Sequence, residues 1–477
     1  MTIHKHFIFL IGCFLTLICA GQVSEQPNFI IFLTDDQGYN DVGVFGAANI
    51  KTPHLDQMAQ EGMLFTNFYA QPLCGPSRAA LLTGSYPMRI AEPENTKEIH
   101  TQIHPKEITI AEILKTKGYK TACIGKWHIG DAPDQMPLKQ GFDYFLGTPK
   151  FNGSTKYIEQ NKFRCSVLKN SDTIKVINTV EEMGLLTKMY TKEALDFIKQ
   201  NRNEPFFLYL SHNMPHVPLG VSNEFKETSK GGFYGDVIEE LDWSMGQVLK
   251  TLKELNLEEN TFVIFTSDNG PWNEAKIGDH GGSAYPLRGN KTQTWEGGVR
   301  VPAIMQWKGK IPENIVSNEL LTTMDFLPTF AALAKAEIPK STIIDGKDLQ
   351  EVLFRNGKSS HDRYYYYFYT HLQAVRDKEW KLVLPRVGKP AYLKWAARKV
   401  EPVEELLLYN LKNDKEETTN VANHHPDKVK ALLLLIEEGR KELGDQDKIG
   451  QNVRFYDSNS KTSRIETYNH WKNTIEK

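Results

Sequence analysis

The sequence predicts an α/β fold with a large mixed, mainly parallel sheet sandwiched by helices. Four short apolar runs have the length and the Ile, Val and Phe content of buried strands, and each ends in polar residues. They span residues 28–36, 121–128, 205–216 and 261–270. Segments with helical periodicity, at 108–118 and 235–255, lie between these runs. Because the carboxyl ends of parallel strands share one edge of a sheet, the polar residues that close the four runs should converge there.

Beyond about residue 360 the pattern changes to that of a smaller C-terminal α+β subdomain. Stretches 363–370, 372–385 and 404–411 have the composition of antiparallel strands. Residues 426–443 have the periodicity of one long amphipathic helix. The last stretch, from Gly444, is polar, and we expect it to be loosely held.

The N-terminus has the pattern of an export signal. Lys5 is followed by an apolar run at 7–20, which is shorter than the roughly 20 residues of a membrane-spanning helix. Small residues at 19–21 suit a signal peptidase. A lipid anchor on Cys19 is less favoured, because the preceding Ile18 is bulky. We therefore expect an exported protein with no membrane segment after signal removal.

These patterns divide the chain of 477 residues into a signal peptide and two further parts. The predicted parts are a signal peptide at 1–21, a catalytic domain at 22–360 and the C-terminal subdomain with its polar tail at 361–477. The formal net charge of −2 provides no long-range attraction to nucleic acid, which is excluded as a partner. Any anionic ligand must therefore be bound by local positive charge.

Two similar stretches, TDDQG (34–38) and TSDNG (266–270), close two of the predicted strands. Asp35 and Asp36 in the first, and Asp268 and Asn269 in the second, offer only hard oxygen ligands. Such ligands suit Ca²⁺ or Mg²⁺, and not zinc, which prefers nitrogen and sulfur. Either stretch alone is equally consistent with a simple turn, but the pair favours a metal site.

The stretch PLCGPSRAALLTG (72–84) places a cysteine at the start of a predicted helix. Only Cys74, Cys123 and Cys165 remain after signal removal, too few for a disulfide framework. Pro76 and Ser77 favour a helix start, with Ser77 as the cap, so backbone N–H groups and the Arg78 charge should lie near Cys74. This setting favours anion binding and thiolate chemistry. Cys123 is interpreted as a small buried apolar residue.

This chain resembles the type I sulfatases closely at their first signature, here Cys74-Gly75-Pro76-Ser77-Arg78 followed by AALLTG at 79–84. Their second signature is similar to GKWHIG at 125–130. The resemblance covers almost the whole mature chain, including 287–302 and 407–422. It implies an alkaline-phosphatase-like fold and the activity of a sulfuric ester hydrolase of the arylsulfatase type.

The resemblance also implies a cofactor and a modification. In this family the motif cysteine, here Cys74, is oxidised to Cα-formylglycine by a formylglycine-generating or other sulfatase-maturing enzyme. One hydroxyl of the hydrated aldehyde attacks the sulfur of the ester, and deprotonation of the other releases sulfate. The implied Ca²⁺ site, with Mg²⁺ less favoured, includes the modified Cys74 and four further residues. These are Asp35, Asp36, Asp268 and Asn269.

Further catalytic roles follow from the resemblance, residue by residue. Arg78 and Lys126 would hold and polarise the two hydroxyls, and His128 would be the base that triggers sulfate release. His216 and Lys291 would bind the sulfate and protonate the leaving oxygen. Removal of one such charge-stabilising group typically slows a reaction about 10²–10³-fold.

Two other classes of protein compete with a sulfatase. The first is a phosphodiesterase or phosphonate monoester hydrolase on the same scaffold, and the second is a non-catalytic glycan-binding relative. Phosphatases on this scaffold commonly use Thr or Ser with two metals, which the pattern from Cys74 to Arg78 argues against. Because every expected catalytic position is filled, a purely binding protein is disfavoured.

The expected substrate is a sulfated carbohydrate, such as fragments of a marine algal polysaccharide like ulvan or carrageenan. A glycan on the sequon at Asn290 would crowd the site, which favours a bacterial source and a periplasmic or secreted protein; a second sequon is at Asn152. Specificity should come from four long loops at the strand ends: 85–106, 131–175, 214–233 and 271–287. Candidate sugar contacts in them are Arg89, His100, His104, Trp272, His280 and Tyr285.

Overall fold

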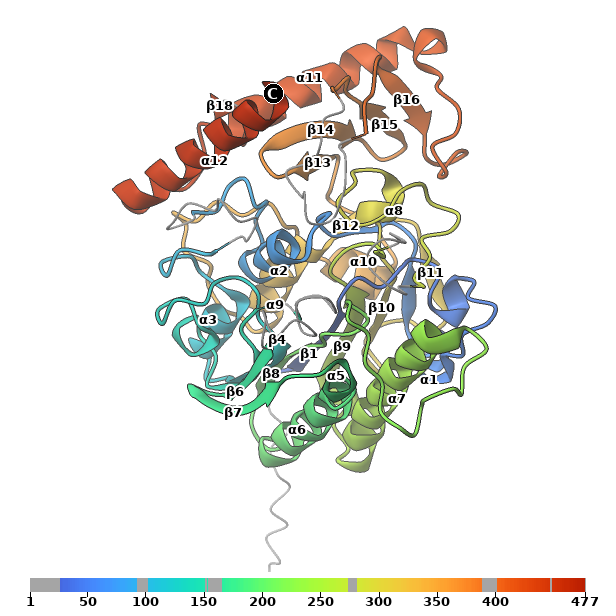
Figure 1. Cartoon of the computed structure of the whole chain (residues 1–477), viewed down its shortest axis with the longest axis vertical. Coiled ribbons are helices and arrows are strands. Elements are labelled where there is room, and N and C mark those ends of the chain that lie inside the picture. The colour runs from blue at the N-terminus through green and yellow to red at the C-terminus, as the bar shows by residue number, and fades with distance from the viewer. Residues whose placement is uncertain are drawn as a thin grey trace, which may run out of the picture.

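A large central sheet covered by helices on both faces joins a smaller sheet with two long helices, α11 (Pro426–Glu442) and α12 (Ser458–Glu476) (Figure 1). The computed structural model describes residues 26–91, 102–150, 152, 165–272, 281–387, 401–446 and 448–476. The predicted signal peptide lies outside the described residues. None of the helices in the described part of the chain is both long and apolar enough to span a membrane.

Within the described residues, the large sheet contains ten strands. In chain order they are β1 (Asn28–Thr34), β2 (Met63–Phe65), β4 (Lys120–Lys126), β5 (Tyr144–Thr148), β6 (Cys165–Lys169), β7 (Asp172–Ile177), β8 (Phe206–Ser211), β9 (Thr261–Ser267), β10 (Ala303–Gln306) and β11 (Ile315–Ser317). Their order in space is β11-β2-β10-β9-β1-β8-β4-β5-β6-β7. The five neighbours from β9 to β5 are all parallel, whereas β10, β6 and β7 pair antiparallel with the strands beside them. The prediction of a mixed, mainly parallel sheet is therefore confirmed.

Strand β1 shows why the predicted strands read as continuous apolar runs. Phe29, Ile31 and Leu33 pack in the core on one face of the sheet, and Ile30 and Phe32 pack in the core on the other. All five side chains are 0% exposed. A strand that is buried on both faces needs apolar side chains at every position, not at alternate ones.

Helices from different parts of the chain cover the two faces. Helices α2 (Cys74–Thr83), α3 (Ile110–Lys115), α9 (Phe326–Leu333) and α10 (Gln350–Arg355) contribute to the core that contains Phe29. Helices α1 (Pro53–Gln60), α5 (Val180–Met183), α6 (Leu186–Gln200) and α7 (Gly232–Glu254) contribute to the core that contains Ile30. The predicted helices at 108–118 and 235–255 correspond to α3 and α7.

The C-terminal subdomain contains the antiparallel sheet and the long helix that the sequence predicts, but the stretch 372–385 forms two strands of that sheet. Its antiparallel sheet consists, in spatial and chain order, of β13 (Tyr364–Phe368), β14 (His371–Arg376), β15 (Trp380–Val383) and β16 (Leu407–Asn410). The long helix α11 (Pro426–Glu442) buries Leu432 and Ile436 in the same core as this sheet. Short pairs complete the fold: β3 (Phe68–Tyr69) with β12 (Leu321–Thr322), and β17 (Gly444–Asp445) with β18 (Lys448–Ile449).

The polar stretch from Gly444 is more ordered than the sequence predicts. After β17 and β18 it forms helix α12 (Ser458–Glu476), which lies beside the C-terminal subdomain in Figure 1. Arg454 pairs at 2.7 Å with the fully buried Glu107 of the catalytic domain. Arg464 donates to the carbonyl oxygens of Pro87 and Ile90. The expectation of a loosely held tail is wrong, because these polar side chains bind partners that lie far away in the sequence.

Candidate active site

The carboxyl ends of β1, β4, β8 and β9 lie side by side at one edge of the sheet, as predicted. Asp35 and Asp36 follow β1, and Asp268 and Asn269 follow β9. These four side chains are all 0% exposed. Side chains that are far apart in the sequence therefore form a single polar cluster inside the protein.

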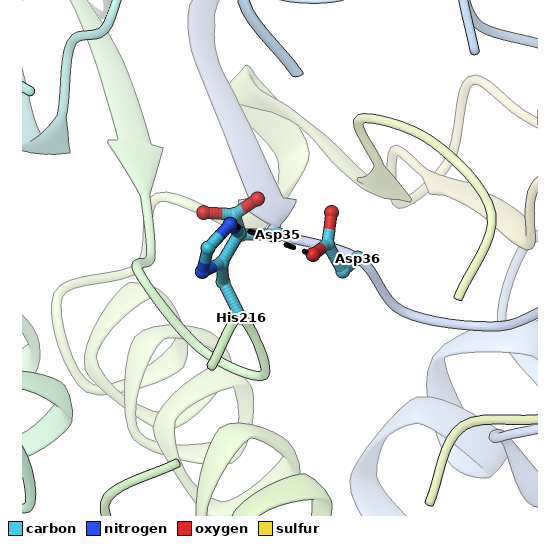
Figure 2. A group of neighbouring side chains, drawn as sticks. All are labelled: Asp35, Asp36 and His216. Carbon is cyan, nitrogen blue, oxygen red and sulfur yellow. Dashed lines mark ion pairs between the residues drawn. The ribbon is translucent and has the colours of Figure 1, made fainter. Parts of the chain in front are cut away.

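The acidic side chains form one group of potential metal ligands. Ligand atoms of Asp35, Cys74 and Asp268 lie within 4.8 Å of one another, as do those of Asp35, Asp36 and His216 (Figure 2). The Asn269 amide donates to Asp36 Oδ1 at 2.8 Å. Among the described residues, Asp35 Oδ1 and Asn269 Oδ1 are buried without a hydrogen-bond partner. Buried oxygens of this kind, supplied by carboxylates and an amide, fit a hard divalent cation.

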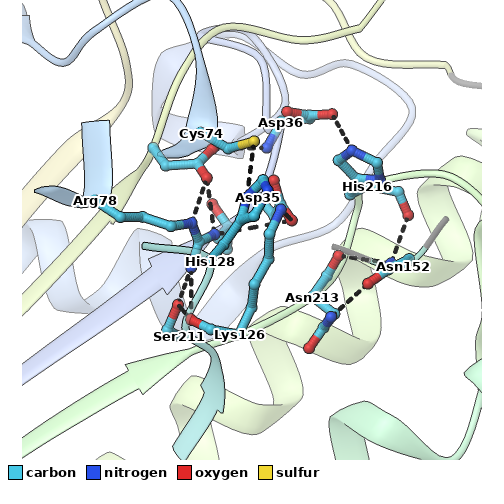
Figure 3. Close-up of polar contacts among 12 residues, drawn as sticks. Asp35, Asp36, Cys74, Arg78, Lys126, His128, Asn152, Ser211, Asn213 and His216 are labelled. Carbon is cyan, nitrogen blue, oxygen red and sulfur yellow. Dashed lines mark hydrogen bonds and ion pairs between the residues drawn. The ribbon is translucent and has the colours of Figure 1, made fainter. Parts of the chain in front are cut away.

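Each carboxylate of the cluster also contacts a buried cation, and Figure 3 labels two of these cations, Arg78 and Lys126. Arg78 donates through Nε and Nη2 to Asp268 Oδ2, at 2.9 and 2.7 Å. Lys126 Nζ lies 2.5 Å from Asp35 Oδ2, and Lys291 Nζ lies 2.7 Å from Asp36 Oδ1. All three cations are at most 2% exposed. Buried ions need such partners, because an unpaired charge in the interior is strongly unfavourable.

The cations do not act equally on the three carboxyl groups. Burial alone would raise the pKa of Asp35, but Lys126 and the other cations around it bring that pKa well below its ordinary value. Lys291 likewise overcomes burial and lowers the pKa of Asp36. For Asp268, burial and the charge of Asp35 outweigh Arg78 and raise the pKa to about 7. Of these three groups, Asp268 is the one that binds a proton near neutral pH.

Cys74 is the first residue of α2 and points at the cluster. Its Sγ lies 3.3 Å from His128 Nδ1, and the residue is 6% exposed. Burial raises the pKa of the Cys74 thiol, because it outweighs the favourable charges of Lys126 and Lys291. The prediction that this setting favours a thiolate is therefore wrong. The expected cap is also wrong: Leu73 precedes the helix without a side-chain cap, and Ser77 Oγ accepts instead from the Gln71 N–H.

The two histidines reach the cluster from opposite sides. His128 has a left-handed backbone with φ of 62°, and its N–H donates to the Pro149 carbonyl at 3.1 Å. His216 is hydrogen-bonded through Nδ1 to the Val217 carbonyl, which leaves Nε2 facing Asp36 at 3.7 Å. Burial, with the nearby Lys291 charge, lowers the pKa of His216 to about 4. His216 is therefore neutral at pH 7.

Uncharged side chains that the sequence analysis missed hold these groups in place. Ser211 Oγ, at the end of β8, accepts from Arg78 and donates to the Lys126 carbonyl. Asn213 accepts from the Tyr190 hydroxyl at 2.9 Å. Asn152 donates to the backbone carbonyls of Asn213 and His216 at 3.3 Å. The sequence signal was present, since Ser211 and Asn213 continue a buried apolar run.

The structure gives different outcomes for the candidate sugar contacts. Arg89 is bound to Asp345 and His104 to Asp457, so both hold the fold together. Trp272 is 1% exposed, whereas Tyr285 is 70% exposed and stays a candidate. His100 and His280 lie outside the described residues. Asn152, part of a sequon, is 0% exposed, so its amide cannot accept a glycan in the folded protein.

Comparisons with known proteins agree with this arrangement. The family model described as Sulfatase matches residues 27–336, and the model described as N-sulphoglucosamine sulphohydrolase, C-terminal, matches residues 289–438. The N-acetylgalactosamine-6-sulfatase of Canis lupus familiaris is 39% identical, over 76% of this chain and 72% of the relative. The steryl-sulfatase of Rattus norvegicus is 34% identical, over 76% of both chains.

Solved structures give the same result for the fold. The PsFucS1 sulfatase from Pseudoalteromonas sp. has a TM-score of 0.77 and 31% identity, covering 87% of this chain and 89% of its own. Ps i-CgsB, solved in complex with k-i-k-neocarrahexaose, has a TM-score of 0.75 and 26% identity, covering 95% and 100%.

The paired charges predict a specific pattern of stability. Lys126→Met leaves Asp35 buried without its amine, so in chelator-treated protein we expect the free energy of unfolding to fall by about 3–5 kcal/mol. Adding Asp35→Asn removes the uncompensated charge and should restore most of that loss. The measurement is urea unfolding of the single and double variants. Lys308→Met, which breaks an exposed ion pair, is the control and should change the free energy of unfolding far less than Lys126→Met does. No recovery in the double variant would contradict this account.

Proposed function

The chain belongs to the sulfatase family of sulfuric ester hydrolases, and from this premise we propose that it removes sulfate from sulfated carbohydrates. We propose fragments of a sulfated polysaccharide, such as algal ulvan, as the substrate class. The observation that carries the proposal is the cluster of buried cations and histidines around Cys74 Sγ, which suits a sulfate ester. Relatives named for N-acetylgalactosamine-6-sulfate, and a neighbour solved with a carrageenan oligosaccharide, support a carbohydrate.

The nucleophile in this proposal is Cys74 after its conversion to formylglycine by a maturing enzyme. When formed, the hydrated aldehyde would supply two hydroxyls, one to displace the alcohol from sulfur and one whose deprotonation would release sulfate and restore the aldehyde. His128 Nδ1, 3.3 Å from Cys74 Sγ, is placed to remove a proton from a group on that carbon. The neutral, buried thiol is consistent with this role, because in this chemistry the sulfur is replaced and is not itself the nucleophile.

We propose Ca²⁺, with Mg²⁺ less favoured, as the cation held by the four strand-end side chains. These are Asp35, Asp36, Asp268 and Asn269. Calcium accepts a larger and more flexible set of oxygen ligands than magnesium. Bound there, the ion would polarise a sulfate oxygen and stabilise the charge that develops on it.

The groups that assist the leaving alcohol are Lys291 and His216. Because Asp36 overcomes the effect of burial, the pKa of Lys291 is raised and the amine is protonated at pH 7. His216 is neutral at that pH, since burial lowers its pKa to about 4. Lys291 therefore supplies the proton, and His216 Nε2, which faces the same Asp36 carboxylate, binds the substrate beside it.

We also propose that the protein acts outside the bacterial cytoplasm, in the periplasm or after secretion. The basic start at Lys5 and the apolar run at 7–20 support export. Sulfated polysaccharides are too large to enter a cell intact, so an exported sulfatase would meet their fragments directly.

The first test of the proposed function compares the hydrolysis of two generic esters. A sulfatase should hydrolyse 4-nitrophenyl sulfate with a kcat/KM at least about tenfold above that for 4-nitrophenyl phosphate, a difference of about 1.4 kcal/mol. Desulfation of a panel of ulvan, carrageenan and galactosamine oligosaccharides then identifies the sugar. Preference for the phosphate would favour a phosphodiesterase or phosphonate monoester hydrolase, and binding of oligosaccharides without turnover would favour a glycan-binding protein.

A second prediction concerns Cys74. In protein co-expressed with a formylglycine-generating enzyme, peptide mass spectrometry should find an aldehyde in place of the thiol. Cys74→Ala should lower kcat by at least about 10³-fold, because the nucleophile is lost. Cys123→Ala, a change at another buried cysteine, is the control and should keep the activity. Active protein with only an intact thiol at position 74 would contradict the proposal.

A third prediction concerns the metal. Chelation should abolish activity, and Ca²⁺ should restore it better than Mg²⁺, except in Asp268→Ala. Because the pKa of Asp268 is raised to about 7, cation binding near pH 6 should release a proton, whereas near pH 9 the group is already ionised and none is released. Calorimetry in buffers of different ionisation enthalpy measures this proton. Full activity of metal-stripped enzyme would rule the cation out.

A further inference from the structure

Trp272, three residues beyond Asn269, contacts the two side chains assigned to the leaving alcohol, Lys291 and His216. We propose that it is a positioning residue that holds Lys291 and His216 in place for protonation of the leaving oxygen. This inference rests on the proposed function and deepens it. With 1% of its surface exposed, the indole cannot stack on a sugar, which was its expected role from the sequence.

The contact with Lys291 is electrostatic. Lys291 Nζ lies 4.4 Å from the centroid of the Trp272 ring, and the same amine contacts Asp36 Oδ1 and Oδ2 at 2.7 and 2.8 Å. The ammonium group is thus held by a carboxylate and by the negative face of an indole. Tryptophan provides the strongest such face among the aromatic residues, and burial strengthens the attraction. The Lys291 N–H also donates to the Pro271 carbonyl at 3.0 Å, so the segment just before the indole holds the lysine backbone as well.

The contact with His216 is a packing contact between two rings. The imidazole and indole rings meet edge to face, with centroids 5.8 Å apart and an interplanar angle of 88°. The hydrogen bond from Nδ1 to the Val217 carbonyl fixes one side of the imidazole, and the indole limits its movement on another. Trp272 and Asp36 are therefore common neighbours of both groups.

This arrangement matters because a lysine side chain has four rotatable bonds. A proton donor must lie within hydrogen-bond reach of the leaving oxygen, and small displacements of a catalytic group carry large rate penalties. A smaller side chain at position 272 would leave the amine attached to Asp36 but free to rotate about that contact. It would also admit water beside the charge, which weakens every electrostatic interaction there.

Leaving groups provide a readout that separates positioning from general structural damage. A poor leaving group, such as the alcohol of a sugar or a basic phenol, depends on a proton donor, whereas an acidic phenol such as 4-nitrophenol departs with little help. Loss of a positioned donor should therefore slow basic leaving groups selectively. Damage to the nucleophile or to the metal site would slow all of them alike.

The experiment measures kcat/KM on a series of substituted phenyl sulfates, from 4-nitrophenyl to 4-methoxyphenyl, with the mature full-length enzyme. We expect Trp272→Leu to lose about 10–100-fold on the most basic phenol and less than about fivefold on 4-nitrophenyl sulfate, which steepens the dependence on leaving-group basicity. Trp272→Phe keeps an aromatic face and should give an intermediate slope. It also carries the test if the leucine variant does not fold.

The matched control is Trp307→Phe. Trp307 is also buried and stacks on Phe262, but it follows β10 at the opposite edge of the sheet. Its replacement should leave the slope unchanged. A parallel loss across the whole series in both Trp272 variants would overturn the inference while leaving the proposed function intact. A wild-type enzyme that hydrolyses none of the sulfates would overturn the proposed function, and this inference with it.

Discussion

The active site depends on the pairing of buried carboxylates with buried cations at the edge of the sheet. Asp35, Asp36 and Asp268 have no access to solvent, and each contacts a buried arginine or lysine, with Arg78 reaching both Asp268 and Asp35. The partners come from different elements: the end of β4, the first turns of α2 and the loop after Trp272. Since an unpaired charge in the interior is strongly unfavourable, the cluster forms only when these elements assemble together. Folding and active-site assembly are therefore the same event at this edge.

Buried ion pairs also join the C-terminal subdomain to the catalytic domain. Lys381 of β15 is fully buried and contacts Glu296 at 3.1 Å and Glu417 at 2.7 Å. Glu296 begins α8 (Glu296–Val299), five residues after Lys291. The C-terminal subdomain thus anchors the segment that carries a proposed catalytic lysine. Arg454 makes a comparable contact to Glu107, so a polar tail that the sequence leaves without a role also supports the catalytic domain.

The sequence predicted the framework well because the signals for it are local. Apolar runs such as 28–36 and 261–270 identify buried strands, and the polar residues that end them identify the edge where the site forms. The failures share one cause, which is that burial and distant partners cannot be read from neighbouring residues. The reactivity expected of Cys74 ignored its burial, and the sugar contacts expected of Arg89 and His104 ignored the carboxylates that bind them.

By itself, the sequence determined the four apolar runs that form β1, β4, β8 and β9, the signature around Cys74 and the residues available for chemistry. Those are properties of short segments, and short segments keep them wherever they lie in the fold. Only the tertiary structure decided the pairing of each charge, the neutral state of His216 and the contact between the Trp272 ring and the Lys291 amine. These follow from desolvation and from contacts between residues far apart in the chain, and both exist only once the sheet has brought its strand ends together.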